Sequence, residues 1–289
     1  MSCPDCFSGT QRTAQPQGKM IRLYGLDTYV AEPAPSSAPP KGIIVIIPDA
    51  FGLAFTNNKL LADTYAAKGG YLVYLPDFML GHSAPAYMLD SMKIVLAPGN
   101  YLIKPYHIVR LALAFLPWLY HNRVSRSWPT VHAFFTSLAA DQGRSQGYGG
   151  TATLPIGVAG FCWGGKHALL LTHQASHHGP TKKPLVDAVF TGHPSLLELP
   201  GDVERIKDVP VFFALAERDH RVKVPEHSGL IEGIVGAEDR DQRERGVVKV
   251  YGDCAHGFCV RADPWAVDAK RAEEAEEDAI RWFDEKLRR

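Results

Sequence analysis

Short apolar runs alternate with segments of helical periodicity along much of the chain. Residues 42–47 and 71–75 are almost wholly apolar, and each is followed by a proline; the first run is also rich in β-branched side chains. Runs of this kind are typical of strands that are buried on both faces of a sheet. Between them, residues 57–68 carry Leu, Tyr and Ala at helical spacing and end at a Gly-Gly pair, which predicts a helix.

A strand, a helix and a strand joined by short links predict a parallel sheet with right-handed crossovers. The same alternation resumes in the second half of the chain. We expect further strands at 155–159, 186–191, 211–216 and 247–251, helices at 166–172 and 265–287, and one or two edge strands within 19–31. The pattern predicts an α/β fold in a single domain, residues 1–289, with a mostly parallel, twisted sheet and helices on both of its faces.

Residues 77–128 interrupt this rhythm. They are rich in aromatic and aliphatic side chains, are broken by Pro98, Pro105 and Pro117, and include the strongly apolar run LALAFLPWL at 111–119. We interpret this stretch as a helical insertion that covers the sheet edge or the mouth of an active site. A helix lying on a membrane surface is the alternative, whereas the segment is too short and too broken to span a bilayer.

Composition narrows the class of protein. The 289 residues carry 31 basic and 31 acidic side chains, so a general nucleic-acid binder is not expected. Five cysteines in a chain of this length do not indicate a disulfide scaffold. The N-terminal segment lacks the apolar core of a signal peptide, and no stretch is long enough for a stable membrane span, so we expect a cytoplasmic location.

The segment with the clearest chemical meaning is Gly-Phe-Cys-Trp-Gly at residues 160–164. A predicted strand runs into it and a predicted helix follows at once, which is the nucleophile-elbow pattern with Cys162 in place of serine. The flanking glycines allow the strand and the helix to cross closely, and the helix N-terminus favours a thiolate. A buried structural cysteine beside a glycine-rich turn is the alternative interpretation.

An elbow nucleophile needs a base, and the base needs an acid that orients it. Asp219 follows the strand predicted at 211–216 and is the best acid, with Glu217 as the fallback. His256 follows the last predicted strand and is the best base. Both lie beyond the carboxyl ends of strands, where ligands gather in open α/β sheets. Three other histidines stay open as rivals for the base: His193, His220 and His227.

Taken together, these motifs resemble the dienelactone hydrolase family of α/β-hydrolases, and its fungal members in particular. The likeness rests on the elbow, the Asp219 loop and the His-Gly-Phe sequence at 256–258. It extends to Met-Ser-Cys-Pro-Asp-Cys at 1–6, Phe-Gly-Leu at 51–53, Asn-Asn-Lys-Leu-Leu-Ala-Asp at 57–63 and Pro-Asp-Phe at 76–78. Only residues 82–150 match loosely.

The resemblance implies an α/β-hydrolase fold and a Cys-Asp-His triad, which falls on Cys162, Asp219 and His256. It also implies an oxyanion hole made by the backbone N–H groups of Trp163 and Ala50.

The resemblance further places the substrate near three residues, Asp49, Phe51 and Arg261. Asp49 stands where bacterial members have a glutamate that helps to form the thiolate, and Arg261 matches an arginine that holds a substrate carboxylate. A second such arginine remains unassigned among Arg110, Arg123 and Arg126.

We therefore expect a lactone or ester hydrolase that forms a thioester on Cys162, takes a small-molecule substrate and needs no metal or organic cofactor. The apolar insertion favours a bulkier substrate than the family's small charged lactone. A homodimer remains open. The alternatives are isomerisation, acyl transfer or C–C cleavage at the same site, a binding protein that has lost catalysis, and redox or zinc chemistry at Cys3 and Cys6. Cys254 and Cys259 are expected to be packing residues.

Overall fold

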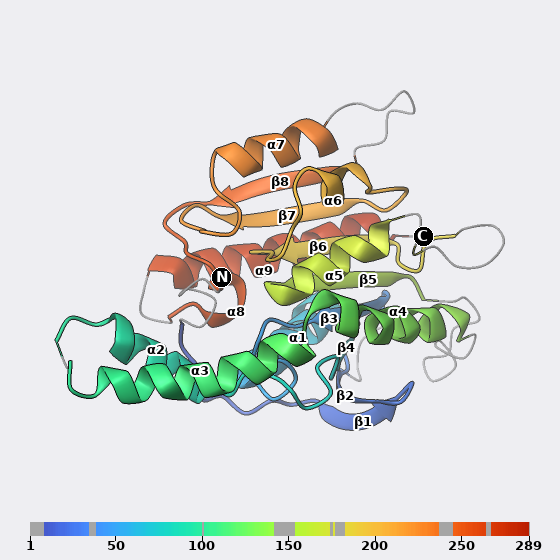
Figure 1. Ribbon diagram of the computed structural model, residues 1–289. Helices are drawn as coiled ribbons and strands as arrows, with labels where there is room; N and C mark the ends of the chain where they lie inside the picture. Colours follow the sequence, from blue (N-terminus) through green and yellow to red (C-terminus); the bar gives the residue numbers. More distant parts are fainter. Residues whose placement is uncertain are drawn as a thin grey trace.

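The computed structural model describes residues 9–34, 39–99, 101–141, 154–173, 176, 183–236, 245–263 and 267–288. Its centre is a sheet of eight strands in the order β1-β2-β4-β3-β5-β6-β7-β8 (Figure 1). Strands β3 to β8 run parallel to one another, whereas β2 pairs antiparallel with both β1 and β4. The predicted α/β fold with a mostly parallel sheet is confirmed.

The strands are β1 Lys19–Leu23, β2 Leu26–Ala31, β3 Ile43–Ile47, β4 Leu72–Pro76, β5 Ile156–Phe161, β6 Ala188–Gly192, β7 Val211–Ala216 and β8 Gly246–Tyr251. All the strands expected from the apolar runs are present, within one or two residues at most ends. The segment at 19–31 forms an edge hairpin in which Leu23 pairs with Leu26.

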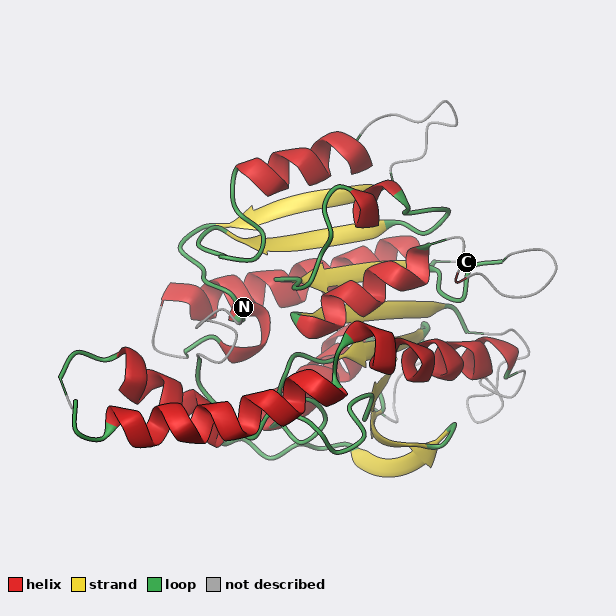
Figure 2. Cartoon of the chain, viewed as in Figure 1, coloured by secondary structure: helices red, strands yellow, loops and turns green. Residues whose placement is uncertain are grey.

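Helices cover both faces of the sheet (Figure 2). They are α1 Thr56–Gly69, α2 Tyr87–Leu96, α3 Lys104–His121, α4 Val124–Ala140, α5 Trp163–Thr172, α6 Gly201–Glu204, α7 Glu226–Val235, α8 Phe258–Arg261 and α9 Val267–Lys286. Helices α1 and α9 pack on one face, and α4, α5 and α7 pack on the other. The helix expected from residue 166 begins three residues earlier, at Trp163. Its first turn includes Gly164 and Gly165, which have low helix propensity and therefore do not predict a helix from the sequence.

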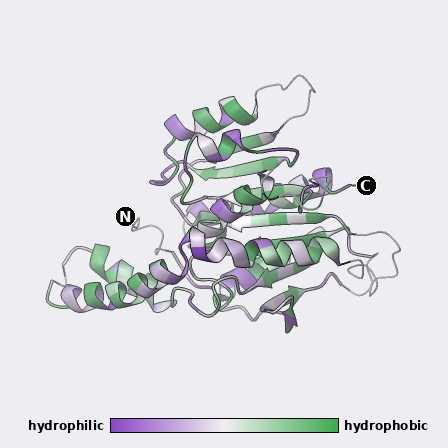
Figure 3. Ribbon diagram, turned by 45° about the vertical axis from the view of Figure 1, so that its right-hand side comes forward, coloured by the Kyte–Doolittle hydropathy of each residue, from purple (hydrophilic) through white to green (hydrophobic). Residues whose placement is uncertain are grey.

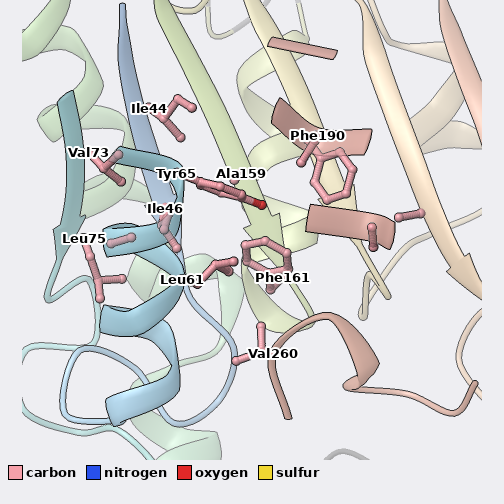
Figure 4. Close-up of a cluster of buried hydrophobic side chains, with 14 of the residues drawn as sticks. Ile44, Ile46, Leu61, Tyr65, Val73, Leu75, Ala159, Phe161, Phe190 and Val260 are labelled. Atoms are coloured by element: carbon pink, nitrogen blue, oxygen red, sulfur yellow. The ribbon is translucent and has the colours of Figure 1, made fainter. Parts of the chain in front are cut away.

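The core lies in two layers, one on each face of the sheet. Along β3 the side chains alternate between them: Ile44 and Ile46 join the layer under α1 and α9, while Val45 joins the opposite layer. Figure 4 shows the first layer, where Leu61 and Tyr65 from α1 meet side chains of the central strands. All five residues of β3 are buried, as expected for a strand with a helix layer on each side.

The insertion at 77–128 contains α2, α3 and the start of α4, and the α2–α3 pair extends away from the sheet (Figure 1). The inner face of α3 packs against the core through Leu111, Phe115 and Trp118. The predicted helical insertion is therefore confirmed. Among the residues that the structure describes, no helix combines the length and the apolar character that crossing a membrane requires.

Candidate active site

Cys162 stands at the turn between β5 and α5. Its backbone has φ 51° and ψ −111°, an unfavourable conformation for a residue with a Cβ, and such strain gathers at functional sites. The turn is held by hydrogen bonds: the Cys162 N–H donates to the Gly192 carbonyl at 3.1 Å, and the Cys162 carbonyl accepts from Gly165 N–H at 3.1 Å. The strand–turn–helix context that defines a nucleophile elbow is thus present.

The two glycines of the motif are required by close packing. A Cβ on Gly160 would lie 2.6 Å from the Ala168 Cβ of the following helix. A Cβ on Gly164 would lie 2.8 Å from the Pro48 carbonyl oxygen, after strand β3. Both distances are too short for real Cβ contacts. Glycine at 160 is therefore needed for β5 and α5 to cross this closely, and glycine at 164 is needed for the start of α5 to approach the end of β3.

His256 and Asp219 form a hydrogen-bonded pair at the same edge of the sheet. Nδ1 of His256 lies 2.8 Å from Oδ2 of Asp219, and both side chains are buried. The other carboxylate oxygen of Asp219 accepts the Arg221 backbone N–H at 2.7 Å, which fixes the carboxylate. A carboxylate on Nδ1 sets the tautomer in which Nε2 of a neutral ring is free to accept a proton.

Ser195 connects this pair to the cysteine and was not found by the sequence analysis. Its hydroxyl oxygen lies 3.4 Å from the Cys162 sulfur and 3.3 Å from Nε2 of His256. Its backbone N–H donates to the Cys162 carbonyl at 2.8 Å, so the loop after β6 is fixed to the elbow. The sequence feature that could have identified Ser195 is its position two residues beyond His193, at the carboxyl end of a parallel strand.

A cavity of about 410 Å³ opens over Cys162. Ala50 and Trp163, whose N–H groups were predicted to form an oxyanion hole, both line it with the cysteine. The remaining described lining is mainly apolar and comes from α3 and the residues that follow it, from the loop after β6 and from the loop after β7: Phe115, Trp118, Leu119, Asn122, Arg123, Val124, Ser195, Leu196, Leu197, Glu198 and Arg221. Its volume lies within the usual range for small-molecule sites.

Two indole hydrogen bonds fix the insertion to the site. Nε1 of Trp118 donates to the Ala50 carbonyl at 3.1 Å, and Nε1 of Trp163 donates to the Asn122 carbonyl at 2.7 Å. The insertion is therefore held both to the loop after β3 and to the elbow.

Asp49 and Arg261 form a buried ion pair with each other. Asp49 also accepts hydrogen bonds from the Phe51 N–H at 3.1 Å and from the Asn58 side chain at 3.0 Å, and the Arg261 guanidinium lies 5.3 Å from the centroid of the Phe51 ring. Asp49, Phe51 and Arg261, which the resemblance placed near the substrate, thus lie together, but none of them is among the described residues that line the cavity.

The three arginines considered for a second anion contact differ in their surroundings. Arg123 lines the cavity, whereas Arg110 stacks on Tyr87, with 3.8 Å from its guanidinium carbon to the ring centroid. Arg126 donates to the Tyr120 hydroxyl at 2.7 Å. Arg221, which the sequence analysis did not consider, also lines the cavity.

The rival acid and base lie elsewhere. Glu217 accepts the Asp253 backbone N–H at 2.8 Å, whereas the carboxylate bonded to His256 is that of Asp219. His193 is buried edge-to-face against His256, with ring centroids 5.0 Å apart, and is not among the described cavity residues. His227 accepts the Lys223 backbone N–H at 3.2 Å. His220 is likewise absent from the described cavity lining.

The other thiols differ from Cys162 in their surroundings. Burial raises the pKa of Cys254 to about 12 and raises the pKa of Cys259 well above its ordinary value, so both remain protonated. Cys3 and Cys6 lie outside the described residues. Within the described ranges, no group of three or more His, Cys, Asp or Glu side chains is arranged to bind a metal.

Comparison with known proteins identifies similar sequences and folds. A model of the dienelactone hydrolase family matches residues 26–104 and 119–287. Dienlactone hydrolase 1 of Gibberella moniliformis is 27% identical over 282 residues, covering 96% of this chain and 92% of that protein. Hydrolase pyvD of Aspergillus violaceofuscus is 25% identical over 285 residues, covering 98% and 96%.

A crystal structure of dienelactone hydrolase from Anabaena variabilis has a similar fold. It superposes with a TM-score of 0.56 at 15% sequence identity and covers 95% of this chain and 100% of that one. At this identity the likeness concerns the fold alone.

Proposed function

The chain belongs to the dienelactone hydrolase family, which makes it an ester or lactone hydrolase, and we propose that it acts through a thioester on Cys162. The observation that carries the proposal is the continuous set of contacts from the Cys162 sulfur through Ser195 and His256 to Asp219. A nucleophile, a base and an orienting acid in contact are the parts that covalent acyl transfer needs.

In the first half-reaction the thiol proton leaves through the Ser195 hydroxyl. With Nδ1–H of His256 donating to Asp219, Nε2 accepts from Ser195 O–H, and Ser195 Oγ accepts from Cys162 S–H. A concerted shift along these bonds leaves a thiolate and an imidazolium. The thiolate attacks the carbonyl carbon, and the N–H groups of Ala50 and Trp163 stabilise the resulting oxyanion, each contributing about 3 kcal/mol. The C–O bond then breaks, and His256 gives its proton to the leaving alkoxide.

The second half-reaction returns the enzyme to its starting state. Neutral His256 removes a proton from a water molecule, and the hydroxide attacks the thioester carbonyl. Breaking the C–S bond releases a carboxylic acid and the Cys162 thiolate, which recovers its proton from His256. A lactone leaves as one ring-opened hydroxy acid, whereas an ester yields an acid and an alcohol.

The cavity favours a substrate with an apolar body. Phe115, Trp118, Leu119 and Leu197 surround the space above Cys162, and such walls bind aromatic or aliphatic groups by excluding water. We propose a lactone or ester larger and less charged than a small dicarboxylate-like lactone.

Arg261 and Asp49 are proposed to act on substrate charge. The Arg261 guanidinium is already paired with Asp49, so a substrate carboxylate must compete with that carboxylate for it. If it does, Arg261→Met raises KM for an anionic ester and changes KM little for its neutral methyl ester. Equal effects on the two esters contradict this role.

The test of the proposed function is removal of the thiol. Cys162→Ala is expected to lower kcat/KM by several orders of magnitude toward p-nitrophenyl butyrate and the aryl lactone dihydrocoumarin, without loss of folded structure. The matched control is Cys259→Ala, which removes a thiol outside the described cavity lining and is expected to keep the activity. Retained activity in Cys162→Ala contradicts the proposal.

A tracer distinguishes hydrolysis from other acyl chemistry at the same site. Turnover in ¹⁸O-labelled water is expected to place one labelled oxygen in the carboxylate of the product. An unlabelled product from the chain's own substrate indicates isomerisation or transfer to another acceptor.

A further inference from the structure

Helix α3 carries an apolar stripe that faces away from the rest of the molecule. The helix has 18 residues, and none of them is buried. Figure 3 shows hydrophobic positions along the projecting α2–α3 pair. The stripe consists of six side chains that are between 52% and 97% exposed: Leu102, Tyr106, Val109, Leu113, Leu116 and Tyr120. We call these six residues the α3 seam.

The spacing of the seam is that of a helix–helix contact. Successive members lie 4, 3, 4, 3 and 4 residues apart, which is the 3.5-residue repeat of helices that pack side by side. Leu102 lies in the turn just before α3, and the five members within the helix extend for about 21 Å along its axis. The opposite face, with Phe115 and Trp118, is already used by the core and the cavity, so the seam is a second, separate contact face.

From this arrangement we propose that the α3 seam pairs with the α3 seam of a second copy of this chain, antiparallel and about a two-fold axis at residue 111. The order of the spacings is the same in both directions. Reversal therefore places Tyr106 opposite Leu116 and Val109 opposite Leu113 of the other copy, and brings Leu102, in the turn before α3, toward Tyr120 of the other copy. Each tyrosine then meets a leucine, so no two rings compete for one space, and the contact is self-complementary as a two-fold interface requires.

The exposed area is sufficient for such a contact. At roughly 150–200 Å² for each large apolar side chain, the exposed fractions of the seam amount to about 700 Å² per copy. Further apolar surface beside the seam comes from Tyr101, Ile103 and Ile108, each about half exposed or more. A standard stable interface buries about 800 Å² on each partner. A patch of this size is unusual on a monomer.

The charges on the hairpin favour a second copy over a lipid surface. Lys104 and Arg110 are the only Lys, Arg, Asp or Glu residues in α3. Lys104 donates to the Ala97 carbonyl at 2.6 Å, and Arg110 stacks on Tyr87 of α2. Arg123 and Arg126, just beyond α3, reach the end of the seam, but both guanidinium groups lie over the ring of Tyr120. Helices that lie on anionic membranes place free cations along their polar face, whereas all four of these cations are engaged with groups of the same chain.

The first experiment measures mass in solution. Sedimentation velocity of the full chain at 1–100 µM is expected to give a species of twice 31.8 kDa. Leu113→Glu buries a carboxylate opposite Val109 of the partner and is expected to shift this species to the monomer. Leu230→Glu on α7 is the control, because Leu230 is 40% exposed and lies outside the seam, and it is expected to stay dimeric.

A second experiment tests the pairing itself. Leu102→Cys chains mixed with Tyr120→Cys chains are expected to form an inter-chain disulfide under mild oxidation, whereas neither variant alone does so to the same extent. A monomeric full chain at 100 µM, or a dimer unchanged by Leu113→Glu, overturns the proposal. So does a monomer that co-sediments with phosphatidylglycerol vesicles, because the seam then faces lipid. None of these results depends on Cys162 being the nucleophile.

Discussion

The Ser195 hydroxyl oxygen lies 3.3 Å from Nε2 of His256, and the same oxygen lies 3.4 Å from the Cys162 sulfur. A hydroxyl both donates and accepts, so it can serve the neutral thiol–imidazole state and the thiolate–imidazolium state without moving. The relation makes Ser195 a positioning residue for the proton transfer that precedes attack.

Ser195→Ala is expected to lower kcat/KM by about 10- to 100-fold, because the thiol then loses one route for its proton. A merely structural role would not change the protonation of Cys162. The rate of alkylation of Cys162 by iodoacetamide, followed from pH 5 to pH 10, is therefore expected to shift to higher pH in the variant. An unchanged alkylation profile contradicts the role given to Ser195.

Asp219→Asn is expected to lower kcat by about 10⁴-fold, because an amide no longer sets the His256 tautomer or stabilises its charged form. The matched control is Glu217→Gln, which changes the neighbouring candidate acid without touching His256. Steady-state kinetics of both variants decide between them. If Glu217→Gln carries the larger loss, the acid has been assigned to the wrong residue.

Because Asp49 and Arg261 form a buried ion pair, we expect their substitutions to have non-additive effects on the free energy of unfolding. Arg261→Met leaves Asp49 buried without its cation and is expected to cost about 3–5 kcal/mol of unfolding free energy. Asp49→Asn in the same chain removes the stranded charge and is expected to restore a large part of that loss. Urea denaturation of the wild type, the two single variants and the double variant measures the coupling. Simple addition of the two single effects contradicts a direct pair.

His167 predicts how stability depends on pH. Burial lowers the pKa of His167 to about 4, whereas an unfolded histidine titrates near 6.5. Below pH 6.5 the unfolded chain binds a proton that the folded chain does not, so stability falls as the pH falls. The loss from this residue is about 3 kcal/mol between pH 6.5 and pH 4.

Urea denaturation at pH 7 and at pH 4.5 measures this loss. His167→Gln is expected to show a shallower decrease, while His227→Gln, which is not fully buried, is expected to follow the wild type. An equally steep decrease in His167→Gln assigns the pH dependence to other groups.

Much of the fold could be predicted because the strands are short and doubly buried. Runs such as residues 42–47 and 211–216 carry apolar side chains on both faces. A continuous apolar run of this length, ended by a turn residue, favours a strand that is buried on both faces of a sheet. Helices α4 and α7 were not predicted. Helix α4 contains Pro129, and α7 contains Gly229 and Gly233, which lower helix propensity, so tertiary packing rather than local preference defines these helices.

The site could be predicted in part, for a similar reason. Cys162 and His256 follow strands at one edge of a parallel sheet, and topology alone places them together. Ser195 carries no motif of its own, and its position depends on how the loop after β6 folds back onto the elbow. The Asp49–Arg261 pair joins residues 212 positions apart, and the exposure of the α3 seam depends on which face of the helix the core uses. Neither is encoded in local spacing.

The most direct test of the account is the identity of the acylated atom. A reaction of the wild type with p-nitrophenyl acetate, quenched with acid during turnover, is expected to trap one acetyl group, because acid stops hydrolysis of the thioester. Peptide mass spectrometry is expected to place that group on Cys162 as a thioester that neutral hydroxylamine removes. An acetyl group on Ser195, or turnover by the wild type with no trapped acyl group on any residue, contradicts the central claim.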